Sequence, residues 1–357
     1  LPGDAAWEAG GVVAELPPLL RPAAIEPERV TAAAALLHNG RKTALVLGET
    51  VMDEASQRMA SRIAAATGAQ LIGARSGRRV TRGAGLPVVD RIPYPVDQAV
   101  AMLAGVEQMI LVGAHPPVAF FAYPGKPSLL APPDCQMHEL AGLHSDCLAA
   151  LAALADEVDA PDRLHAVHEL SPPALPTGPI SVEKVWAGLA ALLPEGAIVS
   201  DESVTSGRSA HHWMSAAPRH DWMHITGGSI GQGMPAATGA AVACPDRRVF
   251  AMESDGSAMY TLQALWTQAR EQLDVTTILF ANRSYAILQG ELRNLAPDRK
   301  GPKAGAMLSL DNPAIDWVQL AQGMGVPARR VTTAEEYVAA LREGIAEAGP
   351  RFMEVVV

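Results

Sequence analysis

The sequence predicts an α/β protein with two doubly wound parallel-sheet domains. Short apolar segments alternate with amphipathic helical segments in both halves of the chain, which is typical of parallel strands covered by helices on both faces. With 49% hydrophobic and 18% charged residues among 357, the chain has enough apolar material for two cores. A proline-rich segment at 158–180 separates the halves and is expected to be an interdomain linker.

The first half, 19–157, is expected to form βαβ units. One helix, ERVTAAAALLHNG, ends at Gly40, and a second is capped by Asp53 and ended by Gly68. The segment PVDQAVAMLAG is a third expected helix. The expected strands are TALVLG, AQLIGA and QMILVGA.

The second half, 181–357, has the same alternation of strands and helices. Its expected strands are AIVSDE, RRVFAME, VTTILFA and RFMEVVV. Its expected helices are SVEKVWAGLAALLP, TSGRSAHHWMSA, GQGMPAATGAAVA, TLQALWTQAREQ and TAEEYVAALREGIAEAG. A parallel, doubly wound sheet is therefore expected here as well.

Composition excludes several classes of partner. The net charge of −10 argues against a nucleic-acid surface or an anionic membrane as partner. No stretch reaches the roughly 18 uninterrupted apolar residues of a membrane span, and no signal-peptide pattern is present. The cysteines Cys135, Cys147 and Cys244 form no C-x-x-C pair. Reduced thiols and a cytoplasmic location are therefore expected.

Two polar side chains follow two expected strands of the second half. Asp255 comes directly after one apolar segment and Asn282 after the next, 27 residues later. If the strands are neighbours, both side chains lie in one crevice at the carboxyl edge of the sheet. Their oxygens suit Mg²⁺, and the Gly256–Ser257 turn offers N–H groups and a hydroxyl to a phosphate. The alternative is two ordinary strand-end turns, and the spacing alone leaves both open.

The segment SDGSAMYTLQALWTQAREQLDVTTILFANRSYAIL resembles the diphosphate-anchoring motif of thiamine diphosphate enzymes. That motif is Gly-Asp-Gly-Ser, a spacer of similar length, and Asn-Asn. The residues of this segment are most similar to those of acetolactate synthase large-subunit-like proteins and benzoylformate decarboxylases. The resemblance implies that Asp255, the Asn282 side chain and the Ser284 carbonyl bind Mg²⁺. Ser254 and Ala281 depart from the motif, at positions that supply no ligand oxygen in the family.

The resemblance also implies two cofactors, thiamine diphosphate and Mg²⁺, and a set of residues that hold them. It implies a thiamine diphosphate-binding fold for the second half and a central Rossmann-like domain for the first. The residues expected to bind the cofactor are Ser203, Thr205, Ser206, Gly228, Ser229, Ile230, Asp255, Gly256, Ser257, Asn282, Ser284, Tyr285, Ala286 and Ile287. The residues expected at the reacting end are Gly228, Ile230, Ile287 and Leu288.

Two further segments contain residues that the resemblance assigns to cofactor binding. In DESVTSG, hydroxyls are implied to bind the terminal phosphate, although Thr205 and Ser206 could equally cap a helix. In TGGSIGQGMPAATGAA, the Gly228 carbonyl is implied to accept a hydrogen bond from the aminopyrimidine, and Ile230 to hold the cofactor bent. The same stretch contains Gly231-x-Gly233-x-x-Ala, which matches a weak dinucleotide-binding pattern. It is also compatible with a tight turn before an alanine-rich packing helix.

The reaction type is less clearly indicated. Pyruvate decarboxylases carry an acid where Leu288 stands, and a decarboxylase that releases an aldehyde needs a general acid. Its absence at this position favours carboligation, in which a second carbonyl compound is the acceptor. The scattered histidines, including His211-His212 and His165-x-x-His168, show no metal-ligand pattern. They are expected to be solvated or to cap helices, and Tyr123 is expected in a packing loop.

In the resembled family, a pyrimidine-binding domain precedes the central domain. Residues 1–18, which begin LPGDAAW, are expected to be the exit strand and loop of such a domain, itself absent from this sequence. That domain supplies the glutamate that activates the cofactor, in a site formed between subunits. A homodimer or homotetramer is therefore expected. FAD is not expected, because no glycine-rich loop follows TALVLG.

The favoured function is a thiamine diphosphate- and Mg²⁺-dependent carboligase acting on small 2-oxo acids, similar to acetolactate synthase. A benzoylformate-type decarboxylase is the first alternative. A nucleotide-binding oxidoreductase built on the GQGMPA turn and a catalytically silent binding module are the others.

Overall fold

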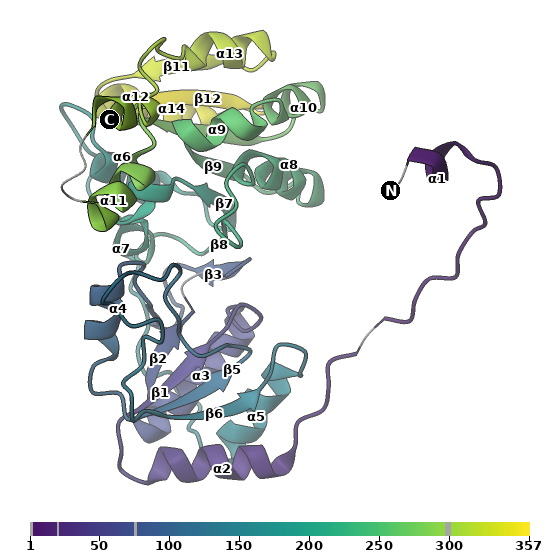
Figure 1. Ribbon diagram of the computed structural model, residues 1–357, viewed down its shortest axis with the longest axis vertical. Helices are drawn as coiled ribbons and strands as arrows, with labels where there is room; N and C mark the ends of the chain where they lie inside the picture. Colours follow the sequence, from purple (N-terminus) through teal and green to yellow (C-terminus); the bar gives the residue numbers. More distant parts are fainter. Residues whose placement is uncertain (1–2, 20, 75–76, 297–300) are drawn as a thin grey trace.

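The computed structural model describes residues 3–19, 21–74, 77–296 and 301–357. Two sheets flanked by helices lie one above the other along the long axis of the molecule (Figure 1). The strand order is β4-β2-β1-β5-β6 in the first sheet and β11-β12-β10-β9-β7-β8-β3 in the second. The predicted α/β class is therefore confirmed. No helix among the described residues is long and apolar enough to cross a membrane.

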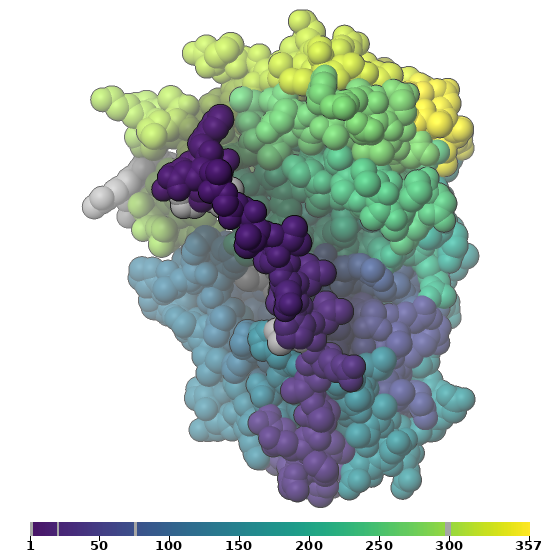
Figure 2. Space-filling view, turned by 90° about the vertical axis from the view of Figure 1, so that its right-hand side faces the viewer, coloured from purple at the N-terminus to yellow at the C-terminus, as the bar shows by residue number. Residues whose placement is uncertain are grey.

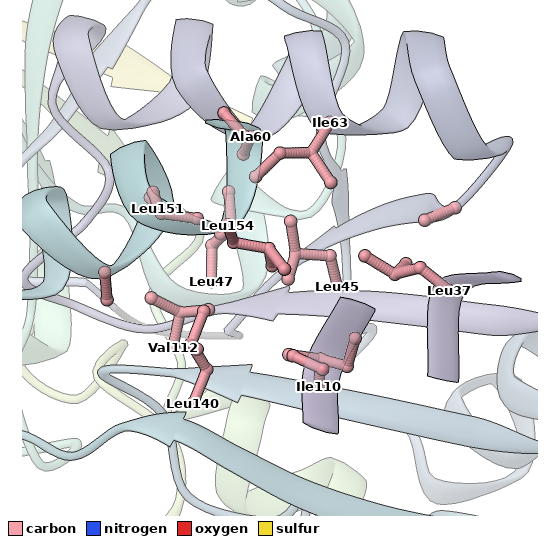
Figure 3. Packing of buried hydrophobic residues seen from close by; sticks show 14 of the residues in the cluster. Leu37, Leu45, Leu47, Ala60, Ile63, Ile110, Val112, Leu140, Leu151 and Leu154 are labelled. Carbon is pink, nitrogen blue, oxygen red and sulfur yellow. The ribbon is translucent and has the colours of Figure 1, made fainter. Parts of the chain in front are cut away.

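The first sheet is parallel throughout its described pairs. Its strands are β1 (Thr43–Leu47), β2 (Gln70–Gly73), β4 (Asp90–Arg91), β5 (Gln108–Val112) and β6 (Gln136–Ala141). The helices are α2 (Pro27–His38), α3 (Glu54–Thr67), α4 (Val96–Leu103) and α5 (Cys147–Glu157). Figure 3 shows the core on one face, where Leu45 and Leu47 of β1 pack with Ile63 of α3 and Leu154 of α5. Burial of such side chains is the main favourable term for this sheet.

Helix α3 begins and ends as its sequence predicts. The Asp53 carboxylate accepts a hydrogen bond from the Ser56 N–H at 3.1 Å, which satisfies a donor that has no partner within the helix. At the other end, Gly68 has φ 75°, the left-handed conformation that glycine adopts at little cost. Local sequence alone thus sets both boundaries.

The second sheet carries the two predicted metal-binding positions. Its strands are β3 (Val80–Arg82), β7 (Ala197–Glu202), β8 (His220–His224), β9 (Val249–Ser254), β10 (Val275–Ala281), β11 (Ala328–Val331) and β12 (Arg351–Val356). Its helices are α6 (Val182–Leu192), α7 (Ala210–Met214), α8 (Gly233–Ala243), α9 (Asp255–Thr261), α10 (Ala264–Arg270), α11 (Ala286–Leu295), α12 (Pro302–Met307), α13 (Trp317–Gly323) and α14 (Ala334–Ala346), with a 3-10 turn η1 (Val204–Gly207). The helix expected in TLQALWTQAREQ begins earlier and is divided into α9 and α10.

Strand β3 belongs to the first half of the sequence and lies in the sheet of the second half. It pairs antiparallel with β8, with Arg82 opposite His220 and Val80 opposite Trp222. This strand was not predicted, because three residues carry no periodic pattern. The proposed boundaries at 157 and 181 stay a prediction, and the two halves share a sheet edge whatever the boundary.

The N-terminal segment differs from expectation. Gly3–Trp7 forms the short helix α1 rather than a strand end, while Leu1 and Pro2 of the expected exit segment lie outside the described residues. The segment extends away from the body of the molecule (Figures 1 and 2), and Trp7 is 90% exposed. Nothing in the two sheets depends on it.

Two helical glycines should respond oppositely to alanine. A Cβ at Gly188 of α6 would lie 2.8 Å from the buried Tyr337 ring of α14, whereas a Cβ at Gly239 of α8 meets nothing within 4 Å. We expect Gly188→Ala to destabilise the fold by about 1–3 kcal/mol through overpacking. Gly239→Ala should stabilise it by up to about 1 kcal/mol through helix propensity. Chemical unfolding followed by tryptophan fluorescence tests this, and shifts of the same sign would contradict it.

Candidate functional site

Asp255 and Asn282 lie at the carboxyl ends of neighbouring strands. β9 and β10 pair in parallel, with Ser254 opposite Phe280, so the residues that follow them reach the same edge of the sheet. The Asp255 Oδ2 atom accepts a hydrogen bond from the Arg283 N–H at 2.5 Å. Two of the three predicted ligand positions are thus brought to the same edge of the sheet.

The electrostatics of Asp255 suit a cation ligand. The residue is 2% exposed, and burial raises the pKa of its carboxyl group to about 6, although hydrogen bonds from the N–H groups of Arg283 and Gly256 oppose the rise. Asn282 Oδ1 accepts one hydrogen bond from the Ser284 N–H at 3.0 Å. Both side chains keep a lone pair for a further partner.

Gly256 lets an aromatic ring close over the turn after β9. A Cβ at Gly256 would lie 2.8 Å from the Tyr285 ring, so only glycine permits this approach. Ser254, which departs from the family motif, donates from its hydroxyl to Ser257 Oγ at 2.9 Å. The departure therefore adds a hydrogen bond within the turn rather than removing a ligand.

The segment after β10 is held by a second strand-like segment. The Tyr285 N–H donates to the Leu308 carbonyl at 3.0 Å, and the Leu310 N–H donates to the Arg283 carbonyl at 2.8 Å. Ser284 lies opposite Ser309 in an isolated antiparallel bridge. This pairing fixes the backbone at Ser284, whose carbonyl is the third predicted metal ligand.

The turn after β7 is strained at Val204. This β-branched residue has φ 46°, a conformation that is rare for its type and that concentrates at binding and catalytic sites. Ser203 is fully buried and its hydroxyl donates to Asp201 Oδ1 at 2.5 Å, so the prediction that Ser203 binds phosphate is not supported by this geometry. Thr205 is half-buried and Ser206 buried. Their roles stay predictions.

The loop between β8 and α8 carries the positions predicted to face the aminopyrimidine. Gly228 has φ 66°, and a Cβ there would lie 2.5 Å from the Phe120 ring of the first half. Gly228 and Ser229 are exposed, while Ile230 is half-buried. A close aromatic contact thus reaches across from the first half of the chain to this loop.

Two buried glutamates lie beneath this loop, and the sequence analysis missed them. Glu202 ends β7 directly opposite Glu253 of β9, and both are 1% exposed. The Glu202 carboxylate accepts hydrogen bonds from the N–H groups of Gly231 and Gly233. Burial raises the pKa of both carboxyl groups, well above its usual value at Glu253, where the adjacent Glu202 adds to the effect. Acids at the ends of adjacent buried strands were the available signal.

This arrangement disfavours the dinucleotide alternative. In that pattern, the amides at the start of the helix hold a pyrophosphate. Here the amides of Gly231 and Gly233 are taken by the Glu202 carboxylate. A Cβ at Gly233 would lie 2.6 Å from Glu253 Oε2, so the glycine serves the packing of carboxyl groups. An added phosphate would meet negative charge rather than free donors.

The start of α11 places the remaining predicted residues. Ala286 begins the helix, Ile287 is half-buried, and Leu288 is 48% exposed. One turn further on, Glu291 accepts a hydrogen bond from the Tyr94 hydroxyl of the first half at 3.4 Å. No group of three His, Cys, Asp or Glu residues suited to a metal occurs in the described ranges, so a cation would rely on Asp255 with neutral oxygens.

The sequence comparisons agree with this geometry. Residues 204–355 match the family model of the thiamine pyrophosphate (diphosphate) enzyme, C-terminal TPP binding domain. The chain is 47% identical over 360 residues to a putative acetolactate synthase large subunit, IlvX, of Mycobacterium tuberculosis, and the match covers 100% of this chain and 69% of that protein. The chain belongs to the thiamine pyrophosphate enzyme family.

Other relatives are more distant. A benzoylformate decarboxylase of Pseudomonas aeruginosa is 34% identical over 186 residues, covering 52% of this chain and 34% of that protein. A thiamine diphosphate-dependent 4-hydroxybenzoylformate decarboxylase of Rhodococcus jostii RHA1 has the same fold, with a TM-score of 0.77 at 24% identity, over 100% of this chain and 68% of that one. The putative acetolactate synthase large subunit thus matches this chain with higher identity and over more of its length than this benzoylformate decarboxylase.

The two glutamates should tolerate amide replacement differently. We expect Glu202→Gln to destabilise the fold by about 1–3 kcal/mol. The NH₂ group of the glutamine would face a backbone N–H whose hydrogen bond the carboxylate accepts in the parent. Glu253→Gln is the matched control. Burial raises its pKa well above the usual value, and its Oε1 has no partner among the described residues, so an amide should change stability little. Chemical unfolding and hydrogen exchange at Gly231 and Gly233 measure both; equal losses would refute the asymmetry.

Asp255 should make stability depend on pH. Because its folded pKa, about 6, lies above the ordinary value of 3.8 for aspartate, its favourable contribution is present below about pH 4 and is lost as the pH rises through 6. Asp255→Asn removes this titration. In EDTA, the stability of the variant relative to the parent should therefore increase between about pH 5 and pH 7.5. A gap that is constant across this range would show that Asp255 titrates normally.

Proposed function

We propose that this chain forms the diphosphate- and Mg²⁺-binding part of an enzyme that acts on small 2-oxo acids, with carboligation of the acetolactate synthase type as its reaction. The observation that carries the proposal is that Asp255 and Asn282 follow neighbouring parallel strands to one sheet edge, in a chain from the thiamine pyrophosphate family. We further propose a cytoplasmic location.

The residues fit the metal. Asp255 offers a buried carboxylate whose raised pKa reflects an unfavourable charge that a cation would offset. Asn282 and the Ser284 carbonyl would complete a set of hard oxygen ligands, which Mg²⁺ accepts alongside phosphate oxygens and water. One charged and two neutral ligands suit a metal that also neutralises a diphosphate.

The other residues hold and shape the cofactor. Gly256 and Ser257 lie beside Asp255 at the start of α9 and would contact the diphosphate. Ile230 would support the bent cofactor from beneath, and the Gly228 carbonyl would accept from the aminopyrimidine. Thiamine diphosphate supplies the carbanion chemistry when bound. The chain itself binds, orients and keeps water away from the reacting end.

Leu288 supports carboligation. It is an exposed apolar side chain at the start of α11, so it cannot donate a proton to the reaction intermediate. A second 2-oxo acid would then be the acceptor. Decarboxylation of the benzoylformate type is the second candidate. It is favoured by Glu291, which shares a helix face with Leu288 and bonds Tyr94, since an acid near this position could serve as proton donor.

We propose that an N-terminal pyrimidine-binding domain and a second subunit complete the site, in a homodimer or homotetramer. Large apolar side chains are exposed on adjacent helices of the second sheet: Val242 of α8, Met259 and Tyr260 of α9, and Trp266 of α10. Exposed apolar groups gathered in this way mark surfaces that contact other protein. The exposed Gly228–Ser229 backbone is compatible with contacts from a partner.

Asp255→Ala tests the proposal. Titration of the full chain with thiamine diphosphate, with and without Mg²⁺, should show Mg²⁺-dependent binding that the variant weakens at least about tenfold, because the charged metal ligand is lost. Asp311→Ala is the control. The Asp311 side chain is 59% exposed, and its Oδ1 atom lies 3.9 Å from Arg283 Nε. Equal affinity of parent and Asp255→Ala would exclude Asp255 as a ligand.

A further inference from the structure

A cavity that is partly open to solvent lies between the two halves of the chain. It is bounded by the end of β2, by β3 and β4, and by β8 and α7. Its described lining contains two arginines and three histidines: Arg82, Arg91, His168, His211 and His224. None of the described lining residues belongs to the predicted cofactor set. Figure 1 shows β3 and β8 at the junction of the two bodies.

Arg82 is fixed in the wall of this cavity. Its backbone pairs with His220 across β3 and β8, and its guanidinium lies 5.0 Å from the centre of the Trp222 ring. Its Nη1 atom is buried and has no hydrogen-bond partner in the described part of the chain. A buried donor left unpaired costs about 1–3 kcal/mol, and more when it is charged, so the position favours an acceptor.

Two neighbouring nitrogens share this property. His211 Nδ1 and Trp222 Nε1 are also buried without partners among the described residues, and both residues line the cavity. His211 is half-buried, and its Nδ1 atom is out of contact with solvent. Burial, with repulsion from Arg82 and Arg91, lowers the pKa of His211 to about 3. Burial and Arg91 together lower the pKa of Arg82 to about 9.

The surrounding acids do not neutralise the cavity. Asp201 accepts from Ser203 and lies 3.9 Å from His224. Asp221 is paired with Arg247 at 2.9 Å. Asp90, which lines the cavity, is exposed and accepts from a glutamine side chain at 3.2 Å. Among the described residues, Arg82 Nη1 and Trp222 Nε1 are thus buried donors at the cavity wall without an acceptor.

We propose that this cavity binds a small oxyanion, a carboxylate or phosphate group, through Arg82 and His211. A guanidinium presents a planar fork of donors that matches both groups, and its stacking on Trp222 limits the entropy lost on binding. The buried Arg82 and Trp222 donors then gain an acceptor that the described residues do not provide. This site does not depend on the proposed catalytic function and is independent of Asp255.

Calorimetric titration of the full chain with inorganic phosphate, pyruvate and ADP tests the site. At least one of the three should bind with one-to-one stoichiometry. Arg82→Gln should weaken that binding about ten- to hundredfold, the loss expected for a charged hydrogen bond, and Arg82→Lys should weaken it less. The matched control is Arg270→Gln, because Arg270 also lies over a tryptophan, 5.4 Å from the Trp266 ring, on the exposed helix α10.

The pattern across ligands identifies the source of the oxyanion. Tighter binding of ADP than phosphate would indicate a nucleotide phosphate, and preference for pyruvate would indicate a carboxylate. His211→Gln, with a thermal unfolding scan of each variant, keeps the test valid if Arg82→Gln folds poorly. Failure of all three ligands to bind in the millimolar range would overturn the proposal. So would equal weakening by Arg82→Gln and Arg270→Gln.

Discussion

The parallel register of β7, β9 and β10 determines where every polar group of the candidate site lies. Because Glu202 is opposite Glu253 and Ser254 is opposite Phe280, the residues that follow these strands arrive at the same level of one sheet edge. Asp255 and Asn282 thereby reach the same edge. A shift of a single residue would turn each of these side chains to the opposite face, so the apolar strands fix the site as firmly as they fix the core.

The long-range part of this geometry could be predicted because it follows from simple rules. Seven buried residues in β10 are read as a strand from their sequence, and parallel strands place their carboxyl ends together. The cap of α3 at Asp53 needs only local chemistry. By contrast, β3 has three residues and pairs with a strand 140 positions away. Only the folded arrangement of both halves creates it, so no local pattern could reveal it.

The sequence motif indicated the candidate site, but the buried side chains that hold the neighbouring loop were missed. Motif residues such as Asp255 stand in a recognisable spacing. Glu202 and Glu253 act through partners that the spacing does not show: one carboxylate accepts two loop amides, and burial raises the pKa of its neighbour. At Ser203, a hydroxyl in the turn expected to bind phosphate donates to Asp201, and its role stays a prediction. Side-chain direction, which sequence does not give, decides both cases.

Strand β8 links the loop between β8 and α8 to the cavity lined by Arg82 and His211. β8 leads from Trp222 and His224, which line the cavity, directly into the loop that carries Gly228 and Ile230. His224 Nε2 lies 2.9 Å from Arg91 Nη2 of the first half and 3.9 Å from Asp201 at the end of β7. Because β3 closes that edge, the cavity, the end of β7 and the start of the loop meet at one junction between the two halves. The wall of the cavity and the start of the loop that carries Gly228 and Ile230 thus rest on the same strand, β8.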